Sequence, residues 1–407
     1  MNFDNNSDWI DKNFISAALK SFENCEEIEI IDFYVTPSEN NQSSYNSVLY
    51  HASITYKQVI EIKHIFVVIK AQPFIENSQH DGDEKTFHTE TQTYKILSEI
   101  QSLMHSIGDK EVLCPKLIYE TIKPRPAIVL EDVNKSGFET MIEEIPMDFE
   151  FSKMVARKLG KFHAGSFYLQ KQRKFSPSNF TFSIYQDFQC INMLFDKPLR
   201  IFIEVLSTWK GYEKFIEPLR EFRKNFASQG VRSYTRNRGN FAFNVLNHGD
   251  FNARNVLFKK NEKNGKFCDM IMLDFQACVF ATPAVDLTYA LYNFLSDENR
   301  QKYRDEFLAI YHQQFVDSLK KFGYKKQPPS LIDLQVEMIR NGNLQVISAI
   351  CLKYLSYFDY KTLEPDDLAN GMRSIKEKAF NSDGFKKMIS EELPRFLYCG
   401  IIPMEEL

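Results

Sequence analysis

The spacing of apolar residues changes about one third of the way along the chain, and this change limits the possible fold more than any other feature. Up to residue 131, short strand-like runs surround one long helical segment, whereas the remainder is mainly helical apart from a strand region near residues 246–275. We therefore predict an α+β protein with two lobes. The smaller lobe, residues 1–131, has an antiparallel sheet and a helix, and the larger lobe, residues 132–407, is mainly helical.

The smaller lobe is expected to contain a sheet and two helical segments. Residues 8–24 have helical spacing, and so does the segment from about Lys85 to Met104, which places Glu90 on its apolar face. The polar stretch at 36–44 separates two strands and indicates a hairpin loop. The expected strands and short apolar runs cover the ranges 28–35, 47–56, 64–71, 116–119 and 127–130.

Composition and charge exclude several classes of function. The 407 residues include 50 basic and 54 acidic ones, for a formal net charge of -4 with no basic block, which argues against binding of duplex nucleic acid. No apolar run reaches the roughly 18 residues that a membrane span needs, and the polar N-terminus does not resemble a secretory signal. The seven cysteines are scattered, without C-x-x-C pairs or metal-site spacing, so we expect reduced thiols, no structural zinc and a cytoplasmic location.

The segment at 245–276, VLNHGDFNARNVLFKK…FCDMIMLDFQ, carries the clearest chemical signal. An HGD sequence ends at Asp250, Asn255 follows five residues later, and Asp274 ends an apolar run. Phosphoryl transfer to a hydroxyl needs a carboxylate that orients the hydroxyl and accepts its proton, and hard oxygen ligands for Mg²⁺. The pattern predicts Asp250 as the base and Asn255 and Asp274 as metal ligands. The alternative is a tight turn capped by Asp250, with Asn255 at the start of a helix.

A strand lysine and a helix glutamate in the smaller lobe are candidates for holding a nucleotide. Lys70 ends the run IFVVIK and shares its strand face with apolar residues, and Glu90 lies on the inward face of the following helix. Kinases hold the α- and β-phosphates of ATP with such a pair. A solvated strand end is the alternative for Lys70, and Glu84 or Glu99 is the alternative to Glu90.

Two acidic residues follow the apolar run AIVL at the predicted lobe boundary. Glu131 and Asp132 occupy the position at which the backbone linking two kinase lobes would meet an adenine. We therefore include both in the predicted nucleotide site, and a simple turn is the alternative interpretation.

Together these motifs resemble those of the ecdysteroid-kinase-like proteins of insects, part of the wider choline/aminoglycoside-kinase-like group. The resemblance rests on N-HGD-x4-N, DFQ and P-A-V-D-L, with VVIK and VLED upstream, and it covers most of the chain. It implies a protein-kinase-like fold and ATP-dependent phosphorylation of a small-molecule hydroxyl, on a steroid hormone for some members. It also implies roles for the matching residues: catalysis by Asp250, magnesium binding by Asn255 and Asp274, and phosphate binding by Lys70 with Glu90 as its partner.

The chain departs from the family in the loop expected to cover the phosphates, near residues 38–46. Relatives generally have a glycine there, whereas this chain reads SENNQSSYN. Without glycine the backbone approaches phosphate less easily, so we expect the hydroxyls of Ser43 and Ser44 to contact phosphate instead. The same loop motivates an alternative function, that of a non-catalytic pseudokinase which binds a small ligand.

Three residues near the motif are expected to support the structure. We expect His163 to pack beneath the catalytic loop and His248 to orient that loop through hydrogen bonds. Asp286 lies in the first turn of a predicted helix, where its negative charge interacts favourably with the helix dipole. A group of C-terminal aromatic residues is expected to form core or, by analogy with the family, an acceptor-site wall suited to a sterol or a choline-like cation. These are Tyr354, Tyr357, Phe358 and Tyr360.

The sequence thus predicts a small-molecule kinase, an ATP:alcohol phosphotransferase. It would use ATP and Mg²⁺ to phosphorylate a hydroxylated, apolar small molecule such as an ecdysteroid-like sterol. A choline- or aminoglycoside-type kinase and the pseudokinase are the alternatives. A protein kinase fits less well, because about eight residues separate Asp274 from the Pro283 helix and leave little room for an activation segment. Nothing in the pattern indicates the oligomeric state.

Overall fold

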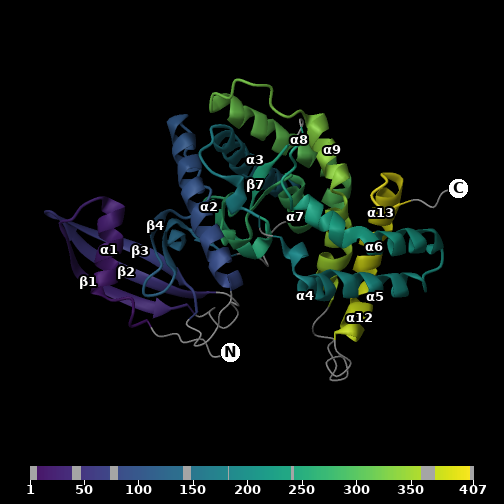
Figure 1. Cartoon of the computed structure of the whole chain (residues 1–407), viewed down its shortest axis with the longest axis horizontal. Coiled ribbons are helices and arrows are strands. Elements are labelled where there is room, and N and C mark those ends of the chain that lie inside the picture. Colours follow the sequence, from purple (N-terminus) through teal and green to yellow (C-terminus); the bar gives the residue numbers. More distant parts are fainter. Residues whose placement is uncertain are drawn as a thin grey trace. The chain divides into compact units, whose positions relative to one another are not determined.

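The computed structural model shows an α+β protein that divides into two compact units (Figure 1). It describes residues 7–38, 47–73, 81–140, 148–181, 183–239, 243–358 and 372–403. The first unit contains Met1–Glu144 and Arg254–Ala277, and the second contains Ile145–Ala253 and Cys278–Leu407. The predicted α+β fold, with an N-terminal antiparallel sheet and a mainly helical remainder, is confirmed. The division at residue 131 into a nucleotide-binding and an acceptor-binding lobe concerns what each part binds, and it stays a prediction.

The first unit contains a five-stranded and a three-stranded antiparallel sheet. The strand order is β1-β2-β3-β5-β4 in the larger sheet and β6-β8-β9 in the smaller one. The helices and strands are α1 (Lys12–Glu23), β1 (Ile28–Pro37), β2 (Val48–Gln58), β3 (Glu61–Ala71), α2 (Asp81–Ser106), β4 (Leu117–Thr121), β5 (Ala127–Glu131), β6 (Phe138–Glu139), β8 (Val256–Lys260) and β9 (Phe267–Met272). Several extend beyond the predicted apolar runs, because polar residues continue the backbone ladder.

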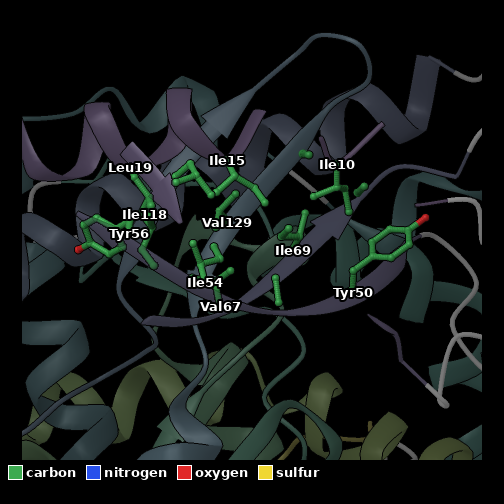
Figure 2. Packing of buried hydrophobic residues seen from close by; sticks show 14 of the residues in the cluster. Ile10, Ile15, Leu19, Tyr50, Ile54, Tyr56, Val67, Ile69, Ile118 and Val129 are labelled. Atoms are coloured by element: carbon green, nitrogen blue, oxygen red, sulfur yellow. The ribbon is translucent and has the colours of Figure 1, made fainter. Parts of the chain in front are cut away.

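The main core of the first unit lies between α1 and one face of the larger sheet. Ile15 and Leu19 of α1 are each 1% exposed, and they point towards residues of the sheet such as Ile54 and Val129 (Figure 2). Because successive strand residues point to opposite faces, the residues of β3 that join this core leave Lys70 on the other face of the sheet. The core therefore orients the lysine without covering it with α1.

A second group of contacts attaches the β8–β9 hairpin to the first unit. The backbone N–H of Met272 donates to the carbonyl of Leu113 at 2.8 Å. Phe138, Leu257 and Ile271 are buried together in a small apolar cluster. These contacts explain why Arg254–Ala277 belongs to the first unit although it lies far along the chain.

The second unit is helical around a short antiparallel ladder of β7 and β10. Its elements are α3 (Phe149–Lys171), α4 (Phe188–Cys190), α5 (Lys197–Leu206), α6 (Ile216–Ser233), β7 (Val245–Asn247), β10 (Val279–Ala281), α7 (Ala284–Asn293), α8 (Asp297–Lys321), α9 (Leu331–Arg340), α10 (Asn343–Ile347), α12 (Arg373–Asn381) and α13 (Asp383–Tyr398). The polar break predicted at 325–330 lies between α8 and α9.

Helices α3 and α8 pack closely at Gly160. A Cβ atom on this glycine would lie 2.9 Å from the backbone oxygen of Tyr311, so the absence of a side chain allows the approach. The face of α3 that was predicted to point inward is buried along its length, at Phe151, Val155, Leu159 and Phe162.

A buried ionic cluster links α13 to α8. The carboxylate of Glu392 is 5% exposed and accepts hydrogen bonds from Arg300 at 2.9 Å, Arg304 at 2.7 Å and Arg395 at 3.2 Å. Burial acts to raise the pKa of Glu392, but the three guanidinium groups outweigh it and lower that pKa to about 2.

We expect this cluster to make stability depend on acid pH. A carboxylate with a lowered native pKa contributes stability above its unfolded pKa and loses it as the pH falls through the native one. Between pH 6 and pH 3, the difference in unfolding free energy between wild type and Glu392→Gln should narrow by about 2 kcal/mol. Urea denaturation measures it. The control is Glu391→Gln, which changes the neighbouring, exposed carboxylate. If the difference in unfolding free energy from wild type did not change with pH for either variant, the assignment of Glu392 would be contradicted.

Candidate functional site

Lys70 lies on β3 with its ammonium group between two carboxylates. Its Nζ atom is 2.7 Å from Oε2 of Glu90, on α2, and 2.7 Å from Oδ1 of Asp274, which follows β9. Lys70 is 8% and Glu90 is 1% exposed, whereas the side chain of Asp274 is 31% exposed. The predicted partner of Lys70 is thus in contact with it, and Glu99 is exposed on α2. Three elements of the first unit meet at one amine.

The two carboxylates keep this amine charged. Burial acts to lower the pKa of Lys70, but the negative charges of Glu90 and Asp274 outweigh it and raise that pKa. Burial is also the main cause that raises the pKa of Glu90, and the charge of Asp274 adds to it. The more exposed carboxylate, Asp274, is therefore the partner that can more readily exchange Lys70 for another cation.

The backbone at Asp274 has an unusual conformation. Its φ angle is 63°, in the left-handed region that residues other than glycine seldom occupy. The side-chain amide of Gln276 donates to Oδ2 of Asp274 at 3.3 Å. Phe275 is fully buried and packs edge-to-face on Tyr94 of α2, with 5.2 Å between ring centroids, and its backbone N–H donates to Glu90. Packing and hydrogen bonds thus hold the strained residue in place, as is common at functional sites.

Asn255 lies beside Asp274 at the open end of the β8–β9 hairpin. The backbone carbonyl of Asn255 accepts a hydrogen bond from the N–H of Leu273 at 2.8 Å. An amide oxygen and a carboxylate are hard donors of the kind that Mg²⁺ prefers, so these two residues fit a magnesium site completed by phosphates and water. Among the described residues, no group of three or more His, Cys, Asp or Glu side chains could hold a metal ion by itself.

The predicted adenine-binding segment continues from β5. The backbone N–H of Glu131 donates to Lys116 at 2.9 Å, and that of Asp132 donates to Phe66 at 3.0 Å, so both amides are engaged within the unit. The carboxylate of Asp132 lies 3.6 Å from Nδ1 of His51. The contact with His51 is the largest influence on the pKa of Asp132 and lowers it. The backbone carbonyl of Asp132 also accepts a hydrogen bond, from the N–H of Lys135 at 3.4 Å.

In the second unit, a buried carboxylate holds the loop that contains Asp250. Asp286 on α7 is 0% exposed, and it accepts hydrogen bonds from the backbone N–H of His248 at 2.6 Å and of Gly249 at 2.9 Å. Gly249 has a φ angle of 82°, which a glycine adopts without strain. The side chain of Asn252 donates to Oδ1 of Asp250 at 2.9 Å. The loop is thereby fixed on both sides of Gly249.

The ring of His163, on α3, contacts the carboxylate of Asp286. Its Nε2 atom lies 3.1 Å from Oδ2 of Asp286, and its Nδ1 atom lies 2.8 Å from the hydroxyl of Tyr311. Burial lowers the pKa of His163 despite the nearby carboxylate. A neutral ring satisfies both partners by donating from Nε2 and accepting at Nδ1. This agrees with the expected structural role of His163, whereas the anchoring of the loop by Asp286 was missed, because its first-turn position indicated only a helix-dipole effect.

The structure groups the predicted site residues in two sets. Lys70, Glu90, Asn255 and Asp274 belong to the first unit, and Asp250 belongs to the second. Ser43 and Ser44 lie outside the described residues, so their phosphate contacts stay a prediction.

The predicted aromatic group takes part in packing of the C-terminal helices. Tyr354 packs on Phe380, with 5.0 Å between ring centroids. Tyr357 packs on Phe385 at 5.9 Å and donates a hydrogen bond to Asp297. Phe358 is 7% exposed, and Tyr360 lies outside the described residues. For the described members, these contacts favour the core interpretation over an acceptor-site wall.

Comparison with known proteins gives one family. The model of the ecdysteroid kinase-like family matches residues 41–324, which is more than half of the chain. No curated protein matches the sequence. Among the described residues, we find no helix with the length and apolar character needed to cross a membrane.

We expect Asp286→Asn to destabilise the second unit and to loosen the loop. The amide has one oxygen where the carboxylate has two, so a backbone N–H of the loop loses its acceptor. Unfolding free energy should fall by about 2–4 kcal/mol, and hydrogen exchange of the His248 and Gly249 amides should accelerate.

The control lies on the same helix. Thr288 is 1% exposed, and the described residues provide no hydrogen-bond partner for its hydroxyl. Thr288→Val should therefore change the unfolding free energy little. Equal destabilisation by the two substitutions would contradict the anchoring role of Asp286.

Proposed function

Because the chain belongs to the ecdysteroid kinase-like family, we propose that it is an ATP- and Mg²⁺-dependent small-molecule kinase. It transfers the γ-phosphate of ATP to a hydroxyl of an apolar acceptor such as an ecdysteroid-like sterol. The observation that carries the proposal is the buried ammonium group of Lys70, held between Glu90 and Asp274 at 2.7 Å from each. A fixed cation beside a partly exposed carboxylate suits a triphosphate with its metal ion.

Residues of the first unit act on the nucleotide. Lys70 donates to oxygens of the α- and β-phosphates, and the buried Glu90 keeps its ammonium group in place while this happens. Asp274, whose side chain is 31% exposed, would hold the metal ion together with Asn255. A Mg²⁺ ion bound there would supply positive charge to neutralise the phosphates. Glu131 and Asp132 border the adenine, and the loop with Ser43 and Ser44 covers the phosphates.

Residues of the second unit act on the acceptor. Asp250 orients the acceptor hydroxyl and accepts its proton as the hydroxyl oxygen bonds to the γ-phosphorus. The bond between that phosphorus and the β,γ-bridging oxygen breaks, and ADP leaves with the electron pair. Asp286 accepts hydrogen bonds from the backbone N–H groups of His248 and Gly249 and so fixes the conformation of the backbone before Asp250. Asp250 precedes Asn255 by five residues, so the chain itself limits their separation to about 18 Å.

The first experiment tests nucleotide binding. Mg-ATP at millimolar concentration should raise the melting temperature of the wild-type protein. Lys70→Met should weaken Mg-ATP binding roughly ten- to hundredfold, because a charge-assisted contact to phosphate is lost. Lys63→Met on the same strand is the control, since Lys63 pairs with Glu23 at 3.3 Å instead. Absence of a shift in the wild-type protein would contradict the proposal and favour the pseudokinase alternative.

The second experiment tests catalysis. ADP release is measured with panels of hydroxylated steroids, choline and aminoglycosides. With an accepted substrate, Asp250→Asn should lower kcat by roughly 10²–10⁴ while the thermal shift with Mg-ATP persists. Asp305→Asn, which changes an exposed carboxylate on α8, should behave like the wild type. Equal turnover by the Asp250 variant would remove this residue from its role, and turnover of choline or aminoglycosides alone would replace the sterol-like acceptor.

A further inference from the structure

A cavity of about 480 Å³ lies within the second unit and is lined mainly by residues of α8, α9 and α13. This volume is within the range of roughly 300–1,000 Å³ that is usual for small-molecule sites. The lining includes the ionic cluster in which Arg300, Arg304 and Arg395 surround Glu392. None of the lining residues has a role in nucleotide binding or proton transfer in the proposed reaction, so the cavity has no assigned function.

The less exposed part of the lining has more positive than negative charge. Three guanidinium groups face two carboxylates there, because Glu392 pairs with all three arginines and Asp297 pairs with Arg300 at 2.8 Å. One positive charge is therefore in excess. The remaining charged residues of the lining are exposed and of both signs, so water screens them. These are Glu298, Lys302, Asp305, Lys387 and Glu391.

A neutral amide lies where two of the guanidinium groups meet. Oε1 of Gln345 accepts hydrogen bonds from Arg304 at 2.6 Å and from Arg395 at 2.5 Å. The amide nitrogen of Gln345 donates to the backbone carbonyl of Met338 at 3.1 Å, which keeps Oε1 directed at the arginines. An amide oxygen accepts hydrogen bonds but has no formal negative charge. Gln345 therefore satisfies donors of both arginines without neutralising them.

The arginines have more donors than the described part of the chain uses. Nη1 of Arg300 is buried and has no hydrogen-bond partner among the described residues, and the guanidinium carbon lies 4.5 Å from the ring centroid of Tyr292. Arg395 donates from Nε to Glu392 and from Nη2 to Gln345, while its side chain is 27% exposed. Each guanidinium group has five N–H donors. The cluster can therefore donate to a further acceptor, and an anionic one would balance its charge.

Apolar side chains line the cavity beside these cations. Leu308, Met338 and Met388 are buried, and Ile339 is 53% exposed. Methionine side chains are flexible and polarizable, so they adapt to apolar groups of different shape. The cavity thus combines cationic hydrogen-bond donors with apolar surface.

We propose that this cavity is a second ligand site, which binds a small organic oxyanion: a carboxylate or a phosphate ester with an apolar body. We name it the arginine cavity and define it by Arg304, Gln345 and Arg395 with Met338 and Ile339. The planar guanidinium fork matches both kinds of head group and binds them through charge-assisted hydrogen bonds. The apolar body packs against the methionines. This inference does not depend on the proposed kinase activity.

Direct binding to the full chain tests the inference. The probes are hexanoate, hexyl phosphate and hexylammonium, which share one apolar body and differ in the head group. Titration calorimetry should show that the wild-type protein binds at least one of the two anions, and hexylammonium at least tenfold more weakly. The anion that binds more tightly identifies the preferred head group. Absence of binding of both anions at millimolar concentration, or equal binding of hexylammonium, would overturn the inference.

A variant of the cluster locates the bound anion. Arg395→Gln should raise the Kd of that anion roughly tenfold or more, because charge-assisted hydrogen bonds are lost. The control is Arg340→Gln on α9, since the side chain of Arg340 is 66% exposed, lies 3.8 Å from Glu337 and does not line the cavity. Urea denaturation shows whether both variants are folded. Equal anion affinity in folded Arg395→Gln and in the wild type would exclude the cluster as the binding site.

A second pair of variants leaves every arginine in place. Ile339→Asp adds a negative charge to the lining and removes apolar surface, so it should raise the Kd of the anion roughly three- to tenfold. Ile332→Asp is the matched control, because Ile332 is 75% exposed on the same helix but does not line the cavity. An equal effect of the two substitutions would contradict binding in the arginine cavity.

The proposed nucleotide site also offers a cation to phosphate, and Lys70→Met separates the two sites. Binding of the anion should be the same in Lys70→Met as in the wild type. Loss of binding in Lys70→Met, with unchanged binding in Arg395→Gln, would place the anion in the nucleotide site and overturn this inference. Binding of the anion by a protein that does not bind Mg-ATP would contradict the proposed function alone.

Discussion

The buried ammonium group of Lys70 is the constraint on which the first unit depends. A charge removed from water is tolerated only when opposite charges and hydrogen bonds surround it. Glu90 and Asp274 provide these, at 2.7 Å each, and they come from elements far apart in the chain. Helix α2 must therefore meet both β3 and the turn after β9. The contact of Phe275 with Tyr94 and the left-handed backbone at Asp274 follow from the same requirement.

The second unit also contains a buried carboxylate that needs hydrogen-bond partners, that of Asp286. Asp286 is as deeply buried as Glu90, but its partners are two backbone N–H groups and a histidine ring rather than a lysine. Hydrogen bonds from neutral donors stabilise the carboxylate and, in return, fix the backbone that provides them. Asp286, satisfied in this way, fixes the shape of a loop, whereas Asp274 pairs with a side chain and is 31% exposed, so it can take a new partner. The two arrangements suit the roles that we propose, with Asp250 as a base on a fixed loop and Asp274 as a metal ligand.

Much of the first unit could be predicted from the sequence, because local periodicity determines which residues share a face. Alternation along the strand IFVVIK and the apolar stripe of α2 placed Lys70 and Glu90 on inward faces. Their pairing was predicted from the way kinases hold phosphates, with Glu84 or Glu99 as alternatives. The anchoring by Asp286 could not be predicted, because it depends on a contact between a helix and a loop well separated in sequence. The hydrogen bond from Gln276 to Asp274 was missed for another reason: it depends on the left-handed turn at Asp274, which no residue pattern signals for an aspartate.

The packing of the β8–β9 hairpin has a consequence for how the motif is held. Asp250 and Asn255 are five residues apart, yet the boundary between the two units falls between Ala253 and Arg254. The core of the second unit therefore positions Asp250, the proposed base, and the core of the first unit positions Asn255 and Asp274, the proposed metal ligands. Substitutions in the core of the second unit can therefore occur without altering Lys70 or its two carboxylate partners.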